Sequence, residues 1–161
     1  MLPAPQKKSD FELQKNQPVM EQVRKQRQPA ESMDVMQILE TASGSKEEAI
    51  KLYNTLSDLV IGDPDFRVMK ANNTLFMYNN NKDGSVDLAM ETADSPRELV
   101  DSLKQFANAM KVAGFKRGNF EIDNPQIIKA MQMAGLKVNT QPSNTLGPDG
   151  MTPTMIGTVE V

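Results

Sequence analysis

The residues between Asn79 and Gly84 have the types and the spacing that could begin a calcium-binding loop. Asn79, Asn81 and Asp83 alternate along the chain and precede Gly84, as in the pattern D-x-[DN]-x-[DN]-G. Such a loop also needs a bidentate glutamate at its last position, and that position holds Met90. The flanking residues alternate between apolar and polar, which is typical of strands and not of helices. The sequence therefore predicts a hairpin here and no metal site.

The chain of 161 residues contains no histidine and no cysteine. Without cysteine it has no disulfide, no thiolate metal ligand and no cysteine nucleophile. Without histidine it lacks the commonest general base, so any proton transfer would depend on aspartate or glutamate. The net charge is −3, but residues 1–30 hold six Lys or Arg and three Asp or Glu, which is +3. The remainder therefore carries −6, and the net charge provides no general attraction for nucleic acid.

Residues 1–31 are rich in Gln, Lys and Pro and contain few large apolar side chains. A segment of this composition cannot bury enough apolar surface to offset its ordering entropy. We expect a polar, basic arm, which is either a disordered tail or a segment that becomes ordered on a partner. The first residues lack the apolar core of a signal peptide, and no long apolar run follows. We therefore expect synthesis in the cytoplasm and no membrane-spanning segment.

The first half of the remaining chain predicts one helix and three strands. The apolar residues of Ser32–Glu40 fit a short helix and a first strand equally well. Ser45 then caps a helix that ends at Gly62, with two glutamates in its first turn. The three strands that follow lie at Phe66–Ala71, Thr74–Asn79 and Val86–Met90.

The second half predicts a long helix that Asp94-Ser95-Pro96 opens and Ala113-Gly114 ends. A strand at Phe120–Ile122 and a short helix that begins after Asn124 and ends at Gly135 follow it. The remaining segments are a strand at Leu136–Val138, a loop at Thr140–Gly150 and a strand at Thr154–Val161. Strands joined by hairpins and then by helical crossovers predict a mixed α/β sheet with helices on both faces.

This order of elements resembles the GCN5-related N-acetyltransferase (GNAT) fold over about residues 33–161. The similarity is strongest at Phe120–Val138, which resembles the family motif V-x-x-x-N-x-x-A-I-x-x-Y-x-x-x-G-F. The matching positions are Asn124, Ile127, Ile128, Met131, Gly135 and Leu136. The resemblance implies a GNAT-like domain over residues 32–161, with a central mixed sheet flanked by helices. The N-terminal arm and a Pro/Gly-rich C-terminal segment extend from it.

The resemblance also implies a pyrophosphate-binding loop, [QR]-x-x-G-x-[GA], before the long helix. Its glycines let backbone N–H groups approach the phosphates of the coenzyme. The equivalent positions here are near Arg97 and Leu99, and neither is glycine. Pro96 lacks a donor N–H, and the carboxylates of Asp94 and Glu98 would repel phosphate. The loop therefore departs from the family's pattern, and we expect no bound cofactor.

The catalytic positions depart from the pattern as well. The family's acid is commonly a tyrosine in the short helix, and Met131 occupies that position. The candidate for a general base is Glu91 on the third strand, whose alternative role is that of a solvent-facing carboxylate. If the domain were active, Ser95, Arg97 and Asn124 would bind acetyl-CoA.

Three hypotheses follow from these departures. The first is a catalytically inactive, GNAT-like binding or structural module, which joins other protein chains of an assembly through its arm and its C-terminal segment. Acyltransferase-like proteins of this kind occur inside bacteriophage particles, which suggests a virion protein. The second is a divergent acyl-CoA-dependent N-acetyltransferase. The third is a nucleic-acid adaptor, which the arm does not favour because no aromatic residue adjoins Lys7, Lys8, Arg24, Lys25 or Arg27 in the sequence. Pro142–Pro153 is either a solvent loop or a strand that pairs with a neighbouring copy.

Overall fold

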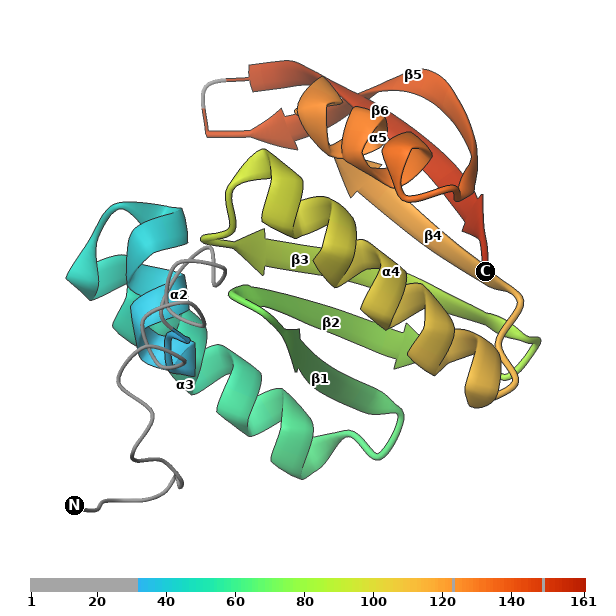
Figure 1. Cartoon of the computed structure of the whole chain (residues 1–161). Coiled ribbons are helices and arrows are strands. Elements are labelled where there is room, and N and C mark those ends of the chain that lie inside the picture. The colour runs from blue at the N-terminus through green and yellow to red at the C-terminus, as the bar shows by residue number, and fades with distance from the viewer. Residues whose placement is uncertain (1–31, 123, 149) are drawn as a thin grey trace, which may run out of the picture. The chain divides into compact units, whose positions relative to one another are not determined.

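The computed structural model describes residues 32–122, 124–148 and 150–161 (Figure 1). The predicted basic arm lies outside the described residues. The helices of the described part are α2 (Val35–Ser43), α3 (Lys46–Gly62), α4 (Pro96–Val112) and α5 (Pro125–Met133). Its strands are β1 (Phe66–Ala71), β2 (Thr74–Asn80), β3 (Ser85–Thr92), β4 (Arg117–Ile122), β5 (Lys137–Gly147) and β6 (Gly150–Glu160). No helix of this part has the length and apolarity that crossing a membrane requires.

All six strands form one sheet in the order β1-β2-β3-β4-β6-β5. Its neighbouring strands are antiparallel except β3 and β4, which run parallel. A parallel pair needs a crossover connection, and α4 provides it (Figure 1). The predicted mixed α/β sheet is therefore confirmed.

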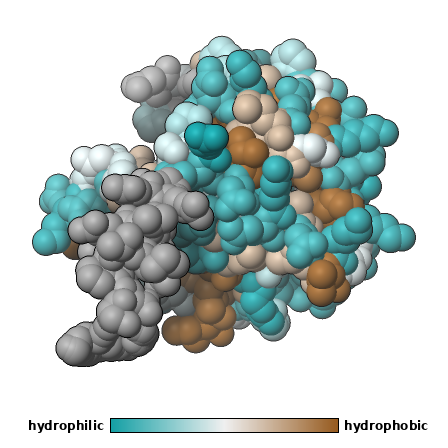
Figure 2. Space-filling model, in the orientation of Figure 1, coloured by the Kyte–Doolittle hydropathy of each residue, from teal (hydrophilic) through white to brown (hydrophobic). Residues whose placement is uncertain are grey.

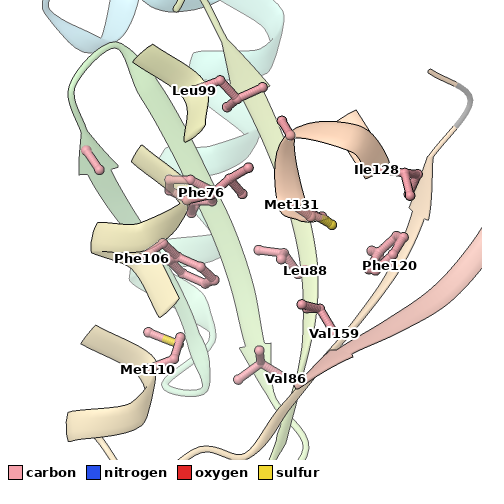
Figure 3. Packing of buried hydrophobic residues seen from close by; sticks show 13 residues of the cluster. Phe76, Val86, Leu88, Leu99, Phe106, Met110, Phe120, Ile128, Met131 and Val159 are labelled. Atoms are coloured by element: carbon pink, nitrogen blue, oxygen red, sulfur yellow. The ribbon is translucent and has the colours of Figure 1, made fainter. Parts of the chain in front are cut away.

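Helices cover both faces of this sheet, as two consecutive residues of β2 show. Phe76 belongs to a core with residues of α4 and α5, where its ring stacks on Phe106 at a centroid distance of 4.3 Å (Figure 3). Leu75 points to the opposite face and packs with Ile38 of α2 and Ala49 of α3. Because side chains alternate along a strand, α4 and α5 lie on one face, and α2 and α3 on the other.

The segment Ser32–Glu40 contributes to a helix and not to a strand. Asp34 accepts a hydrogen bond from the backbone N–H of Gln37, and the side chain of Gln37 accepts one from the N–H of Asp34. This reciprocal capping box satisfies two donors that a helix start would otherwise leave free. Residues Ile38 and Leu39 can then bury their side chains on the sheet.

The residues Asn79–Gly84, which resemble the start of a calcium-binding loop, lie in the predicted hairpin between β2 and β3, where Asn79 pairs with Asp87. The carboxylate of Asp83 accepts hydrogen bonds from the backbone N–H and the hydroxyl of Ser85, at 2.9 and 2.6 Å. Those two bonds lower the pKa of Asp83. The carboxylate therefore stabilises the turn itself.

The prediction of a loop at Thr140–Gly150 is wrong. Strand β5 continues to Gly147 and pairs with β6 along its whole length, from Lys137 with Glu160 to Gly147 with Gly150. Pro142 and Pro153 suggested a loop because proline cannot donate to a strand ladder. Pro142, however, lies in the edge strand β5, and Pro153 lies in β6 beyond the last residue that pairs with β4. At both positions one side of the strand has no neighbour among the described strands, so proline is tolerated.

Candidate functional site

A cleft opens where the two parallel strands of the sheet diverge. Strands β3 and β4 pair only from Ser85 with Arg117 to Leu88 with Phe120. Beyond Leu88, no residue of β3 pairs with β4. A cleft of about 450 Å³ lies between the two strands there. Residues of β3, β4 and α5 form its walls, and Ala42 of α2 closes one side.

Glu91 lines this cleft from the C-terminal end of β3, where it pairs with Leu75 of the neighbouring strand β2. Its side chain is half-buried. Burial raises the pKa of the Glu91 carboxyl because the charged form loses hydration. A carboxylate with a raised pKa accepts protons more readily near neutral pH, which is what a general base needs. Glu91, the base candidate named from the sequence, therefore lines the cleft with a raised pKa, and its role as a base stays a prediction.

The other two cleft positions named from the motif have structural partners. Asn124 lines the cleft at the start of α5, where its side-chain oxygen accepts the backbone N–H of Gln126 at 2.9 Å. Met131, at the position of the family's tyrosine, is almost fully buried in the core under α5. Its thioether carries no proton that could be donated to a leaving group.

Ser95 and Arg97 lie outside the cleft, at the start of α4. The hydroxyl of Ser95 accepts the backbone N–H of Glu98 at 3.3 Å, and the carboxylate of Glu98 accepts the N–H of Ser95 at 3.0 Å. Pro96, between them, has no N–H to donate. A helix start binds an anion through its first N–H groups, so this capping box occupies donors that a phosphate would need.

Asp94 places a carboxylate beside that helix start and is held there by three hydrogen bonds. It accepts the backbone N–H of Asn73 at 2.9 Å and the hydroxyls of Thr74 and Ser102, both at 2.6 Å. The network joins the β1–β2 turn to the β3–α4 corner and to the body of α4. Sequence reasoning named Asp94 only as a repulsive charge, because its partners are distant in the sequence.

A groove of about 630 Å³ between α4 and α5 contains Arg97. Two further basic residues, Lys104 and Lys129, line it beside Val100 and Met133. The groove combines basic side chains with apolar ones, which suits an anionic group attached to an apolar one. The sequence pointed to Arg97, but only the packing of α5 on α4 brings Lys129 next to it.

The carboxylate of Asp101 belongs to the same groove. Hydrogen bonds from the side chains of Asn72 and Gln105, and then the charge of Lys104, lower the pKa of Asp101. The groove therefore holds three cations against one carboxylate that stays ionised.

Neither a model of a protein family nor a curated protein matches this sequence. Solved structures do match. The ribosomal-protein-S18-alanine N-acetyltransferase from Escherichia coli superposes with a TM-score of 0.51 at 8% identity, covering 81% of this chain and 92% of the other. The phosphinothricin acetyltransferase from Sinorhizobium meliloti, solved in complex with acetyl-CoA, gives a TM-score of 0.53 at 9% identity, covering 80% and 85%. This chain has the GNAT fold.

A proposed ribosomal-protein-serine acetyltransferase from Vibrio cholerae gives a TM-score of 0.54 at 10% identity and covers 73% of this chain and 76% of its own. At this level of identity the GNAT neighbours establish the fold alone, and the function has to be argued from the site.

Proposed function

We propose that this chain is a non-catalytic GNAT-fold module that serves as a subunit of a larger protein assembly. The observation that carries the proposal is the capping box at the start of α4, whose hydrogen bonds occupy backbone N–H groups there. Ser95 and Glu98 bond each other's backbone N–H groups, and Pro96 contributes none. The N–H groups of Ser95 and Glu98 are thus engaged within the helix start, and the carboxylates of Asp94 and Glu98 add negative charge where a phosphate would have to bind.

The acid position supports the same proposal. Met131 packs in the core and carries no exchangeable proton, so it cannot protonate a departing thiolate. Loss of both the phosphate donors and the acid leaves a sheet and a cleft without the groups that would bind and use an acyl donor.

Calorimetry with acetyl-CoA tests the loss of cofactor binding. We expect the full chain to show no heat of binding, or binding only in the millimolar range, because the helix start offers no free cradle for phosphate. The Arg97→Ala variant serves as the matched comparison and is expected to behave like the unaltered chain. Micromolar binding that CoA displaces and that Arg97→Ala weakens would refute the proposal.

The contacts of the proposed assembly are the N-terminal arm and the β5–β6 hairpin. Leu146 and Met151 form a cross-strand pair near the hairpin tip, and they are 76% and 61% exposed. From Gln141 to Val159 the sequence contains one charged residue. Leu59, Val60 and Ile61, at the C-terminal end of α3, are also exposed. Figure 2 shows apolar side chains in brown along the lower edge of that face of the molecule. Exposed apolar side chains on a hairpin with so few charges favour contact with another chain. A place in a phage particle stays a prediction.

The hairpin can be tested by size-exclusion chromatography with light scattering over a range of protein concentrations. We expect the full chain to self-associate at high concentration and the double variant Leu146→Ser, Met151→Ser to be monomeric. Met133→Ser is the matched control, since Met133 is 65% exposed but lies on α5. A full chain that stays monomeric throughout, or a Met133→Ser variant that loses association equally, would remove the hairpin from the proposal.

A divergent acyl-CoA-dependent N-acetyltransferase is the second candidate, and two observations favour it. Glu91 lines the β3–β4 cleft with a raised pKa, and Arg97, Lys104 and Lys129 surround the α4–α5 groove. The structural neighbour from Sinorhizobium meliloti binds acetyl-CoA. In this candidate Glu91 would accept the proton of an amine, and Arg97 and Asn124 would contact the coenzyme. The calorimetric experiment distinguishes the two candidates.

A further inference from the structure

The walls of the groove between α4 and α5 are open to solvent. Seven of its nine lining residues are exposed, while Val100 is half-buried and Ala130 is buried. A pocket for a small molecule encloses most of the surface of its ligand. A groove with walls this exposed covers only one side of whatever binds in it. It therefore suits a macromolecular partner better than a small ligand.

The lining residues form two helical rows of the same spacing. On each helix they stand at positions i, i+3, i+4 and i+7, so each row lies on one side of its helix and spans about 10 Å, or two turns. Figure 1 shows the two helices side by side on one face of the sheet. The rows are Arg97, Val100, Asp101 and Lys104 on α4, and Gln126, Lys129, Ala130 and Met133 on α5. Neighbouring helices with such rows present the surface into which a third helix packs.

The cations of this groove are available to a partner. Among the described residues, Arg97 and Lys129 form no ion pair and no side-chain hydrogen bond, and Lys104 forms no ion pair. The carboxylate of Asp101 accepts hydrogen bonds from Asn72 and Gln105, at 3.1 and 2.9 Å, and neither of these donors lines the groove. Carboxylates of a partner could therefore pair with the three cations without displacing an existing ion pair.

An acidic protein helix fits these features better than a nucleic acid does. No aromatic side chain lines the groove for stacking on a base, and the Asp101 carboxylate would repel a phosphate backbone. Val100 and the exposed Met133 lie among the basic residues. Burial of these two side chains needs apolar groups on the partner, and a sugar-phosphate backbone offers few.

We propose that the α4–α5 groove binds an acidic amphipathic helix of another protein chain. The apolar stripe of that helix contacts Val100 and Met133, and its flanking Asp and Glu side chains pair with Arg97, Lys104 and Lys129. The site rests on the proposed function, because a groove that holds a coenzyme is not free for a helix. It adds a contact to the assembly that is separate from the β5–β6 hairpin.

The test uses the full, isotope-labelled chain and two synthetic helical peptides of about 18 residues, or five turns. Both carry leucine at positions i, i+3, i+4 and i+7. One has glutamate on both flanks of this stripe, and the other has lysine at the same places. We expect the glutamate peptide to shift the backbone NMR signals of Val100, Lys104 and Met133 and to bind at least about tenfold more tightly than the lysine peptide.

Charge reversal in the groove should reverse this preference. The double variant Lys104→Glu, Lys129→Glu is expected to bind the lysine peptide more tightly than the glutamate peptide. Its matched control is Lys46→Glu, Lys51→Glu on α3, which changes the net charge equally and should keep the original preference. Met133→Ser should weaken the glutamate peptide by about threefold or more, because an apolar contact is lost. Thermal unfolding verifies that each variant is folded.

Three results would overturn the helix-binding groove. The first is the absence of binding by the glutamate peptide at about 1 mM. The second is equal affinity for the two peptides, or a preference that the folded Lys104→Glu, Lys129→Glu variant retains. The third is tighter binding of a DNA duplex or of phosphatidylglycerol vesicles, which that same variant loses. Acetyl-CoA calorimetry is a separate measurement: micromolar binding there refutes the non-catalytic module, whereas failure of the glutamate peptide alone removes only the groove.

Discussion

Replacing Gly157 by alanine is expected to destabilise the fold by about 3 kcal/mol, as overpacking at a rigid position does. A Cβ atom at Gly157 would lie 2.5 Å from the backbone oxygen of Asn139 and 2.9 Å from Cζ of Phe120. The backbone of β5 cannot retreat without breaking its pairing with β6, and the Phe120 ring is almost fully buried. The free energy of unfolding in urea measures the loss.

Gly62→Ala is the matched control for this substitution. Gly62 ends α3, and a Cβ atom there would meet nothing within 4 Å. Because alanine favours helix more than glycine does, Gly62→Ala should be neutral or stabilising by up to about 1 kcal/mol. If both variants lost stability equally, close packing at Gly157 would not be the cause.

Gly157 illustrates what the sequence could not predict. Its neighbours read as an ordinary β-prone segment, and the contact that requires glycine involves Phe120, far away in the chain. The helices were predictable because their signals are local. Ser45 and Asn124 cap the helices that they were expected to cap, and Gly135 has the positive φ of 84° expected of a helix-terminating glycine.

The loop predicted in place of the C-terminal hairpin was wrong because the effect of a proline on strand pairing depends on which strands are its neighbours. Proline within a strand argues against pairing in general, but Pro142 and Pro153 each have an open side. The order of strands decides this, and a single sequence does not specify that β6 inserts between β4 and β5.

The sequence named those lining residues of the cleft that a motif position or a strand position points to, and missed residues that only packing brings together. Glu91 and Asn124 were named in advance, and both line the cleft. Lys104 and Lys129 were not, because one lies on α4 and the other on α5, and only their packing joins them. The bonds of Asp94 to Thr74 and Ser102 were missed for the same reason.

Asp94→Ala is expected to cost about 3 kcal/mol, since three hydrogen bonds to a carboxylate are lost at once. Thr74 and Ser102 are fully buried and would lose a charged acceptor, and the N–H of Asn73 would lose its bond to Oδ1. Thermal or urea unfolding measures the effect. Asp94→Asn keeps one oxygen acceptor and should recover part of the loss. Asp87→Ala, at an exposed carboxylate that also accepts two bonds, should cost less than about 1 kcal/mol.

The same variant distinguishes two roles for this carboxylate. If Asp94 only repelled phosphate at the start of α4, Asp94→Ala would keep its stability and gain affinity for acetyl-CoA. In the proposed module the residue joins the β1–β2 turn to Ser102 in α4, so stability falls and acetyl-CoA binding does not appear. A stable Asp94→Ala chain that binds acetyl-CoA would mean that the helix start is blocked by a single charge. The capping box of Ser95 and Glu98 would then not be what closes it.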